Sequence, residues 1–118
     1  MIKKLHSVVI WTEEMGRLVP FYRDVLGLQQ EMDTPEFAVF ASEDGPQLAI
    51  GTHSEVHGRS GDPYRVMVDF QVDDCLAEYE RLKGQGVEFI RPPSQDEGAI
   101  IATLSDPDGN LLQLFQMT

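Results

Sequence analysis

Two stretches of the chain repeat the same order of apolar and polar patterns, and the first runs from residue 5 to residue 51. Residues 5–12 are rich in β-branched and aromatic side chains and predict a strand. A helix follows, because apolar residues recur at helical spacing at positions 18, 21, 22, 25 and 26. Gly27 marks the end of this helix, and Pro20 places the start of its regular part near Arg17. Extended runs at 28–32, 37–41 and 47–51 complete this half, with a turn at 44–46 between the last two.

The second stretch begins after the polar, glycine-spaced segment that joins the halves. Residues 64–72 alternate strictly between apolar and polar types, which predicts a strand with one apolar face. Asp74 can cap a helix that Gly84 and Gly86 end, with Leu76, Tyr79 and Leu82 on one side of it. Three further strands are predicted at 87–90, 99–104 and 111–115, the last two joined by a turn at 106–110.

The order β-α-β-β-β therefore occurs twice, which indicates an internal duplication. The sequence predicts a single α+β domain of two βαβββ modules, about 1–52 and 64–118, joined by a loop at 53–63. Each module has one helix for four strands, so one face of each sheet stays bare unless the sheets curve toward each other. We expect a curved mixed sheet with a central cleft and the helices outside.

The charge and the cysteine content of the chain limit the classes of partner and the compartment that we expect. The chain has 118 residues, and its 20 acidic and 9 basic side chains give a formal charge of −11. Such a charge repels nucleic-acid phosphates and anionic membrane surfaces, so we expect neither partner. Cys75 is the only cysteine, which excludes an intramolecular disulfide and fits a reducing compartment. No segment approaches the ~20 apolar residues of a spanning helix, and the expectation is a cytoplasmic protein.

Four motifs resemble the vicinal oxygen chelate (VOC) superfamily, which includes glyoxalase I, extradiol dioxygenases, fosfomycin-resistance enzymes and bleomycin-resistance proteins. They are His6 in the first strand, Phe-Tyr-Arg-Asp-Val-Leu-Gly-Leu at 21–28, Val-Asp-Asp at 72–74, and Asp-Pro-Asp-Gly-Asn at 106–110. In this order and spacing they cover essentially the whole chain and imply the fold. They imply much less about function, because this scaffold carries lyases, transferases, dioxygenases and binders.

In metal-dependent relatives the resemblance implies ligands from the first and fourth strands of each module, usually two His and two Glu. Here the matching positions hold His6, Gln47, Met67 and Gln113. This set has one imidazole, two amides and a thioether, whereas zinc, nickel and iron favour imidazole and ionised carboxylate. We therefore expect no cofactor, with one divalent ion (Zn, Ni, Mn or Fe) as the alternative. Asp69 shares the strand face of Met67 and could substitute as a ligand.

The same positions can line a binding cleft instead, since amides supply donors and acceptors and a thioether is a pliable wall. The predicted cleft residues are His6, Gln47, Met67, Asp69, Gln71 and Gln113. No catalytic residue is assigned. For His6 a neutral, hydrogen-bonded side chain on a strand stays an alternative to a role in the cleft, and the amides and Met67 could instead be relics that fill space.

Other chemistry-bearing residues have structural interpretations. His53, His57 and Arg59 lie in the joining loop, which is either a lid or a solvated linker. Cys75 follows Asp74 at a helix start, and a packed thiol is favoured over a nucleophile. Asp106 and Asp108 are typical of turn chemistry rather than of a carboxylate pair.

Three functions remain open. The first is a homodimeric small-molecule binder that resembles the metal-free bleomycin-resistance branch. The second is a divergent metal-dependent enzyme, a glyoxalase-type lyase or an extradiol-type dioxygenase for a small oxygen-rich substrate. In it, His6 and Asp69, with a loop His, would hold the ion. The third is a protein–protein module whose cleft is vestigial.

Overall fold

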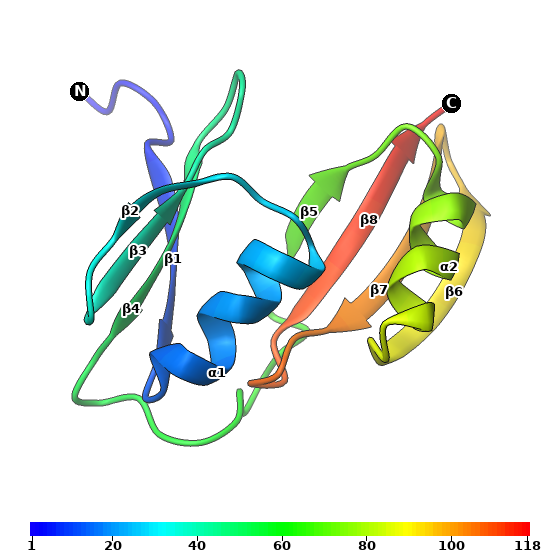
Figure 1. The fold of residues 1–118 in the computed structure, drawn as a ribbon. Helices are drawn as coiled ribbons and strands as arrows, with labels where there is room; N and C mark the ends of the chain where they lie inside the picture. The colour runs from blue at the N-terminus through cyan, green and yellow to red at the C-terminus, as the bar shows by residue number, and fades with distance from the viewer. The chain divides into compact units, whose positions relative to one another are not determined.

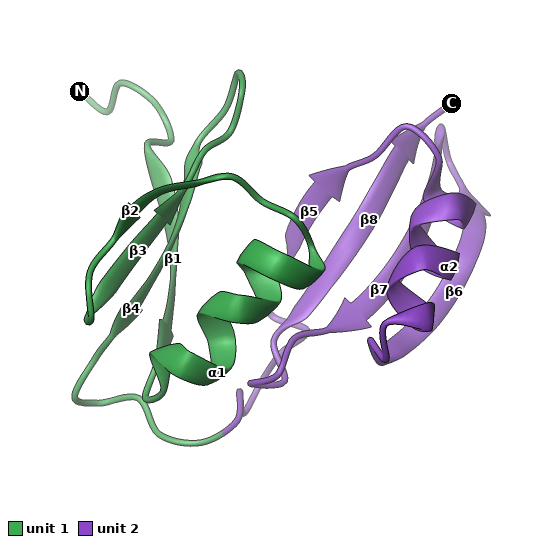
Figure 2. Ribbon diagram, in the orientation of Figure 1, with its two compact units in different colours: residues 1–58 green, residues 59–118 purple.

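Two four-stranded sheets of the same topology, each with one helical segment, make up the chain (Figure 1). A computed structural model describes residues 1–118, and the chain divides into unit 1, residues 1–58, and unit 2, residues 59–118 (Figure 2). The boundary falls inside the predicted joining loop. No helix is long and apolar enough to cross a membrane.

Unit 1 has the element order β-α-β-β-β. Its elements are β1 (Ser7–Thr12), α1 (Met15–Pro20), the π-helical turn η1 (Phe21–Val25), β2 (Gln30–Asp33), β3 (Phe37–Phe40) and β4 (Gln47–Thr52). The strand order is β1-β4-β3-β2, with β1 and β4 parallel and the other pairs antiparallel.

Unit 2 repeats this plan. Its elements are β5 (Val68–Gln71), α2 (Cys75–Gly84), β6 (Phe89–Asp96), β7 (Ala99–Ser105) and β8 (Leu111–Met117). The strand order is β5-β8-β7-β6, again with only the first pair parallel. The prediction of an α+β fold of two βαβββ modules is confirmed, whereas the cleft between them stays a prediction.

The first helix begins two residues before the predicted start. The carboxylate of Glu14 caps it by accepting a hydrogen bond from Gly16 N at 3.1 Å, so Pro20 becomes its sixth residue. Because proline has no N–H to donate, the regular helix ends there and continues as the wider η1 turn, closed by Leu26 N donating to Phe21 O at 2.9 Å. Gly27 then ends it with a φ of 81°, as expected.

The strand predicted at 64–72 is shorter in the structure. Arg65 donates to Asp62 through both its backbone N–H and its guanidinium, at 3.2 and 2.8 Å, which makes a turn of the segment before β5. The alternating pattern is real, but Tyr64 and Val66 are 65% and 75% exposed and pair with no strand. Met67 consequently lies immediately before β5.

Strand β6 is twice as long as the predicted 87–90. It continues through Pro92 and Pro93, whose missing N–H groups argue against a strand in the sequence. They are tolerated because β6 is an edge strand, and its pairing with β7 shifts register on both sides of Arg91.

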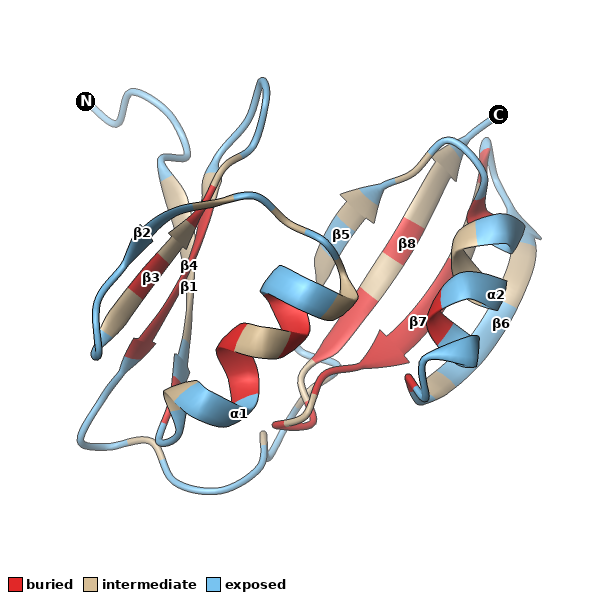
Figure 3. Cartoon of the chain, viewed as in Figure 1, coloured by how far each residue is buried: buried red, intermediate tan, exposed pale blue.

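Each core lies between one helical segment and one face of its sheet, as the buried positions in Figure 3 show. In unit 1 the fully buried side chains include Leu18, Tyr22, Phe40 and Ile50. In unit 2 they include Cys75, Leu82, Leu104 and Leu112. Asp74 caps α2 as predicted, accepting from Ala77 N at 3.0 Å. Of the apolar residues of this helix, Leu82 is buried and Leu76 is 55% exposed.

The motif at 106–110 is a closed turn. The buried carboxylate of Asp106 accepts three hydrogen bonds at 2.9 Å, from Asp108 N, Asn110 N and Asn110 Nδ2. Gly109 has a φ of 80°, a conformation that favours glycine. The structural interpretation of Asp106 is therefore confirmed.

Replacing this carboxylate tests its role. Asp106→Ala leaves two backbone N–H groups of the turn without their acceptor, and we expect the free energy of unfolding to fall by about 2–4 kcal/mol in urea titration. The matched control is Asp44→Ala in the exposed turn of unit 1, where a loss below about 0.5 kcal/mol is expected. Equal losses in the two variants would contradict this account of the motif.

Candidate functional site

The alternation of side chains along the strands gives each sheet two different faces. In unit 1 the face of Phe40, Leu48 and Ile50 packs under α1 and η1, where the rings of Tyr22 and Phe40 lie 6.4 Å apart. The other face carries no helix and is called here the helix-free face. Because paired residues on neighbouring strands point to the same side, the strand register decides which side chains share this face.

On the helix-free face of unit 2, the register lines up one polar row across all four strands. Asp69 pairs with Gln113, Gln113 with Thr103, and Thr103 with Arg91. Three strand spacings separate the ends of this row, about 14 Å. Gln71 lies one pleat along β5 and pairs with Phe115. The row places together two of the predicted residues, Asp69 and Gln113, with two that the sequence analysis did not single out.

Met67 adds to this row from just outside β5. The amide Nε2 of Gln113 donates to Met67 Sδ at 3.6 Å. A thioether sulfur is a weak acceptor, so a ligand with an oxygen acceptor can replace it at small cost. The structure therefore groups four of the six predicted cleft residues, Met67, Asp69, Gln71 and Gln113, in unit 2.

Asp69 is the chemically distinctive member. Its carboxylate makes no hydrogen bond and no ion pair, and Arg91, at the far end of the row, makes none either. Partial burial raises the pKa of Asp69 above the ordinary 3.8, since desolvation disfavours the charged form. An acid in this state accepts a hydrogen bond or a positive charge from a ligand without first giving up a protein partner.

The two predicted residues of unit 1 are placed differently. His6 lies before β1 with an exposed side chain, and its carbonyl accepts from Gln47 N at 3.1 Å. Ser7, not His6, is the register partner of Gln47. The amide Nε2 of Gln47 donates to Glu31 Oε2 at 2.9 Å, in the segment where β2 bulges against β3. Glu31 is thus a carboxylate beside a predicted site residue that no sequence pattern indicated.

The two modules differ in the residue that stands four positions after the glycine of the hairpin turn. Gln113 lies four residues beyond Gly109, and the fourth residue beyond Gly45 is Ala49, one pleat past Gln47. Ala49 pairs with Val9 on β1, as Gln113 pairs with Asp69 on β5. The polar row of unit 2 therefore has an apolar counterpart in unit 1.

The four positions that match the family's ligand positions are a weak donor set for a divalent transition metal. The matching residues offer one imidazole, two amides and a thioether, and the structure engages the amide N–H groups with Glu31 and Met67. Within neither unit do three or more His, Cys, Asp or Glu side chains gather where they could hold a metal ion. Asp69, the possible substitute ligand, has Gln113 and not a histidine as its register partner.

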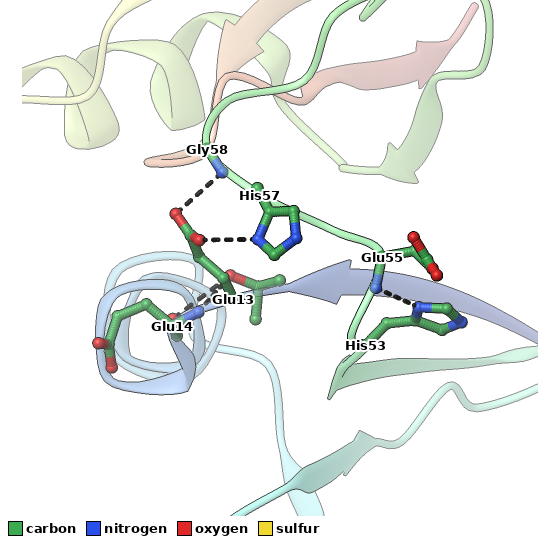
Figure 4. A network of polar contacts seen from close by, with 7 residues as sticks. Glu13, Glu14, His53, Glu55, His57 and Gly58 are labelled. Carbon is green, nitrogen blue, oxygen red and sulfur yellow. Dashed lines mark hydrogen bonds and ion pairs between the residues drawn. The ribbon is translucent and has the colours of Figure 1, made fainter.

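The joining loop is attached to both units. In unit 1 the carboxylate of Glu13 accepts from Gly58 N at 2.9 Å and lies 3.5 Å from His57 Nδ1 (Figure 4). In unit 2, Arg59 Nη1 donates to Pro107 O at 3.4 Å, and Ser60 N donates to Asp108 O at 2.8 Å. These contacts describe an anchored linker rather than a free loop.

Cys75 is a packed thiol, as expected. It is fully buried, and its Sγ lies 4.0 Å from Leu114 O. Burial raises the pKa of the thiol, and the negative charge of Asp74 raises it further. Both effects favour the protonated thiol, which fits a packed side chain.

Sequence reasoning missed Thr103, Arg91 and Glu31. Thr103 stands in an apolar strand and resembles a core position, while Arg91 and Glu31 lie beside bulges that shift the register of their strands. The strand register places Thr103 and Arg91 on the face of Gln113, and the hydrogen bond from Gln47 places Glu31 beside that residue. The sequence Ala-Ile-Ile-Ala-Thr-Leu-Ser at 99–105 does not alternate, so the signal that finds Thr103 is its register pairing with Gln113.

Paired βαβββ modules, each with a helix-free sheet face that carries polar side chains, define the fold class. Residues 4–114 match the family model described as Glyoxalase/Bleomycin resistance protein/Dioxygenase superfamily. The chain belongs to this superfamily, and the resemblance noted from its motifs is confirmed.

Similar proteins cover nearly the whole chain. Among curated proteins, the uncharacterized YetH of Bacillus subtilis is 23% identical over 97% of this chain and 98% of its own length. The uncharacterized YraH of the same organism is 27% identical over 97% and 98%. A glyoxalase/dioxygenase from Nostoc punctiforme has a TM-score of 0.81 at 18% identity, covering 98% of this chain and 92% of that one. A glyoxalase/bleomycin resistance protein/dioxygenase from Nocardioides has a TM-score of 0.76 at 24% identity, covering 99% and 85%.

The raised pKa of Asp69 predicts how stability depends on pH. Above the raised pKa the folded state holds a charge that it solvates less well than the unfolded chain does, so stability falls as the pH rises through the window above 3.8. Asp69→Asn removes this penalty. We expect the variant to be more stable than wild type at pH 7, by less than about 1 kcal/mol after solvent screening, and equal to it at pH 3.

Urea titrations at the two pH values measure the difference. Glu80→Gln on the exposed surface of α2 is the matched control and should leave stability unchanged at both. A destabilised Asp69→Asn protein at pH 7 would show that the carboxylate has a stabilising partner, contrary to this description.

Proposed function

We propose that the chain is a cytoplasmic, homodimeric small-molecule-binding protein that holds its ligand on the helix-free face of unit 2 and uses no resident metal. The observation that carries this proposal is the polar row of unit 2, in which Asp69 has no partner within the protein. The ligand would supply the missing hydrogen-bond donor or positive charge.

The composition of the row supports binding. Asp69 accepts, the hydroxyl of Thr103 both donates and accepts, and the Gln113 amide can exchange its weak sulfur contact for a ligand oxygen. Pockets for small molecules generally combine apolar walls with a few such polar groups, and Leu111 and Phe115 flank Gln113 on the same face. Asp69 is exposed, so its carboxylate is accessible to a ligand.

Two further features support the rest of the proposal. The donor set of the matching positions has one histidine and lacks the second histidine and the carboxylates that hold zinc, nickel or iron in place. This favours binding without metal over lyase or dioxygenase chemistry. Each four-stranded sheet also ends in strands that pair on one side only, such as β1 and β5, and such edges are suited to association with a second copy.

Native mass spectrometry tests the binding function. Wild-type protein is incubated with a deproteinised bacterial extract, and we expect at least one small molecule to remain bound to a species of twice the chain mass. Asp69→Asn should weaken this binding about tenfold, because it removes the negative charge that meets the ligand. Glu80→Gln, an acid-to-amide change on α2, should leave it unchanged.

Other outcomes would contradict the proposal. Equally strong binding by wild type and Asp69→Asn would show that Asp69 is not part of the site. The absence of any bound molecule in wild type would overturn small-molecule binding. A monomer by light scattering at micromolar concentration would contradict the homodimer.

A further inference from the structure

Three rings gather at one end of the helix-free face of unit 1, away from Gln47. Trp11 on β1 and Phe37 on β3 are both register partners of Gly51 on β4, so their side chains flank this glycine on the same face. The ring centroids of Trp11 and Phe37 lie 6.4 Å apart, with an angle of 48° between the ring planes. The helix-free face of unit 1 therefore has a polar end at Gln47 and an aromatic end at Gly51.

Gly51 is required here by space rather than by its backbone angles. A Cβ atom at this position would lie 2.8 Å from Trp11 Cζ3 and 2.8 Å from Phe37 Cδ1, closer than real contacts allow. The absence of a side chain lets both rings lie over the backbone of β4. Any residue other than glycine would force the rings off the sheet.

His53, just beyond β4, is the third ring. Its ring meets Trp11 edge to face, with centroids 5.3 Å apart and an interplanar angle of 69°. Its Nδ1 accepts a hydrogen bond from Glu55 N at 3.0 Å, which Figure 4 shows. In the neutral ring the proton is then on Nε2, so this nitrogen is the donor available to a ligand. The side chain is exposed.

These contacts do not cover Trp11. Its side chain stays 41% exposed, on a sheet face that carries no helix. A large ring held in place by two other rings and still open to solvent gains both apolar burial and stacking when a flat molecule covers it. Because the protein carries a charge of −11, that molecule is better neutral or cationic than anionic.

We infer that Trp11, Phe37 and His53 form an aromatic platform over Gly51 that binds the planar aromatic part of a ligand, with His53 Nε2 donating to an acceptor beside that ring. This inference rests on the proposed small-molecule binding and names the class of molecule that the helix-free face of unit 1 takes. The aromatic platform lies entirely in unit 1 and is independent of the polar row in unit 2.

The single tryptophan of the chain makes the test direct, because an amide-correlation NMR spectrum contains one indole N–H signal, that of Trp11. The probe is 2-naphthamide, which combines a planar ring with an amide acceptor, and its saturated analogue decahydronaphthalene-2-carboxamide is the matched control. We expect 2-naphthamide to shift the indole signal saturably, and the saturated amide to bind at least about tenfold more weakly.

Paired variants locate the binding. Affinity for 2-naphthamide, measured by calorimetry, should fall about three- to tenfold in His53→Ala and in Trp11→Leu. His57→Ala, the other histidine of the loop, and Tyr64→Ala, an exposed aromatic outside the aromatic platform, should bind as wild type. Gly51→Ala should weaken binding by displacing the rings. If the variants at Trp11 and Gly51 fail to fold, the comparison of His53→Ala with His57→Ala still tests the aromatic platform.

Equal affinity for the two amides, an indole signal that does not move, or equal effects of His53→Ala and His57→Ala would each overturn the aromatic platform. These failures are distinguishable from failure of the proposed function. A molecule retained from the extract and lost in Asp69→Asn would leave small-molecule binding in place while the aromatic platform alone is rejected.

Discussion

One helix covers each four-stranded sheet, and this shortage of helices is the constraint on which the rest of the structure depends. The side of each strand that faces α1 or α2 must be apolar, as Phe40, Ile50, Leu104 and Leu112 are. The alternate positions then fall on a face without a helix. Polar groups on that face lie outside the core between helix and sheet, and Asp69 and Gln71 are exposed there.

The two modules use the helix-free face differently. Unit 2 places an acid, an amide and a hydroxyl in register, whereas unit 1 places Val9 and Ala49 at the corresponding pair and rings beyond them. A duplicated scaffold thus presents one polar and one largely apolar face.

Much of this arrangement could be predicted from the sequence, because it depends on local chemistry. Gly27, Asp74 and the 106–110 motif act through their own backbone geometry, and their roles were predicted correctly. The segment at 62–65 forms a turn although the sequence from 64 alternates as a strand does. The bulges beside Glu31 and Arg91 shift the strand register and so change which side chains lie on the same face of the sheet. Such features depend on a partner strand far away in the chain, so a pattern read along one segment cannot reveal them.

The central claim is that this member of the superfamily binds small molecules without a resident metal. Elemental analysis of protein purified without chelators or metal-affinity resin tests it most directly, since the donor set at the matching positions is weak for zinc, nickel, manganese and iron. The account predicts far less than one equivalent of any of these metals per chain. One stoichiometric metal ion per chain, lost in His6→Ala or Asp69→Asn, would contradict it.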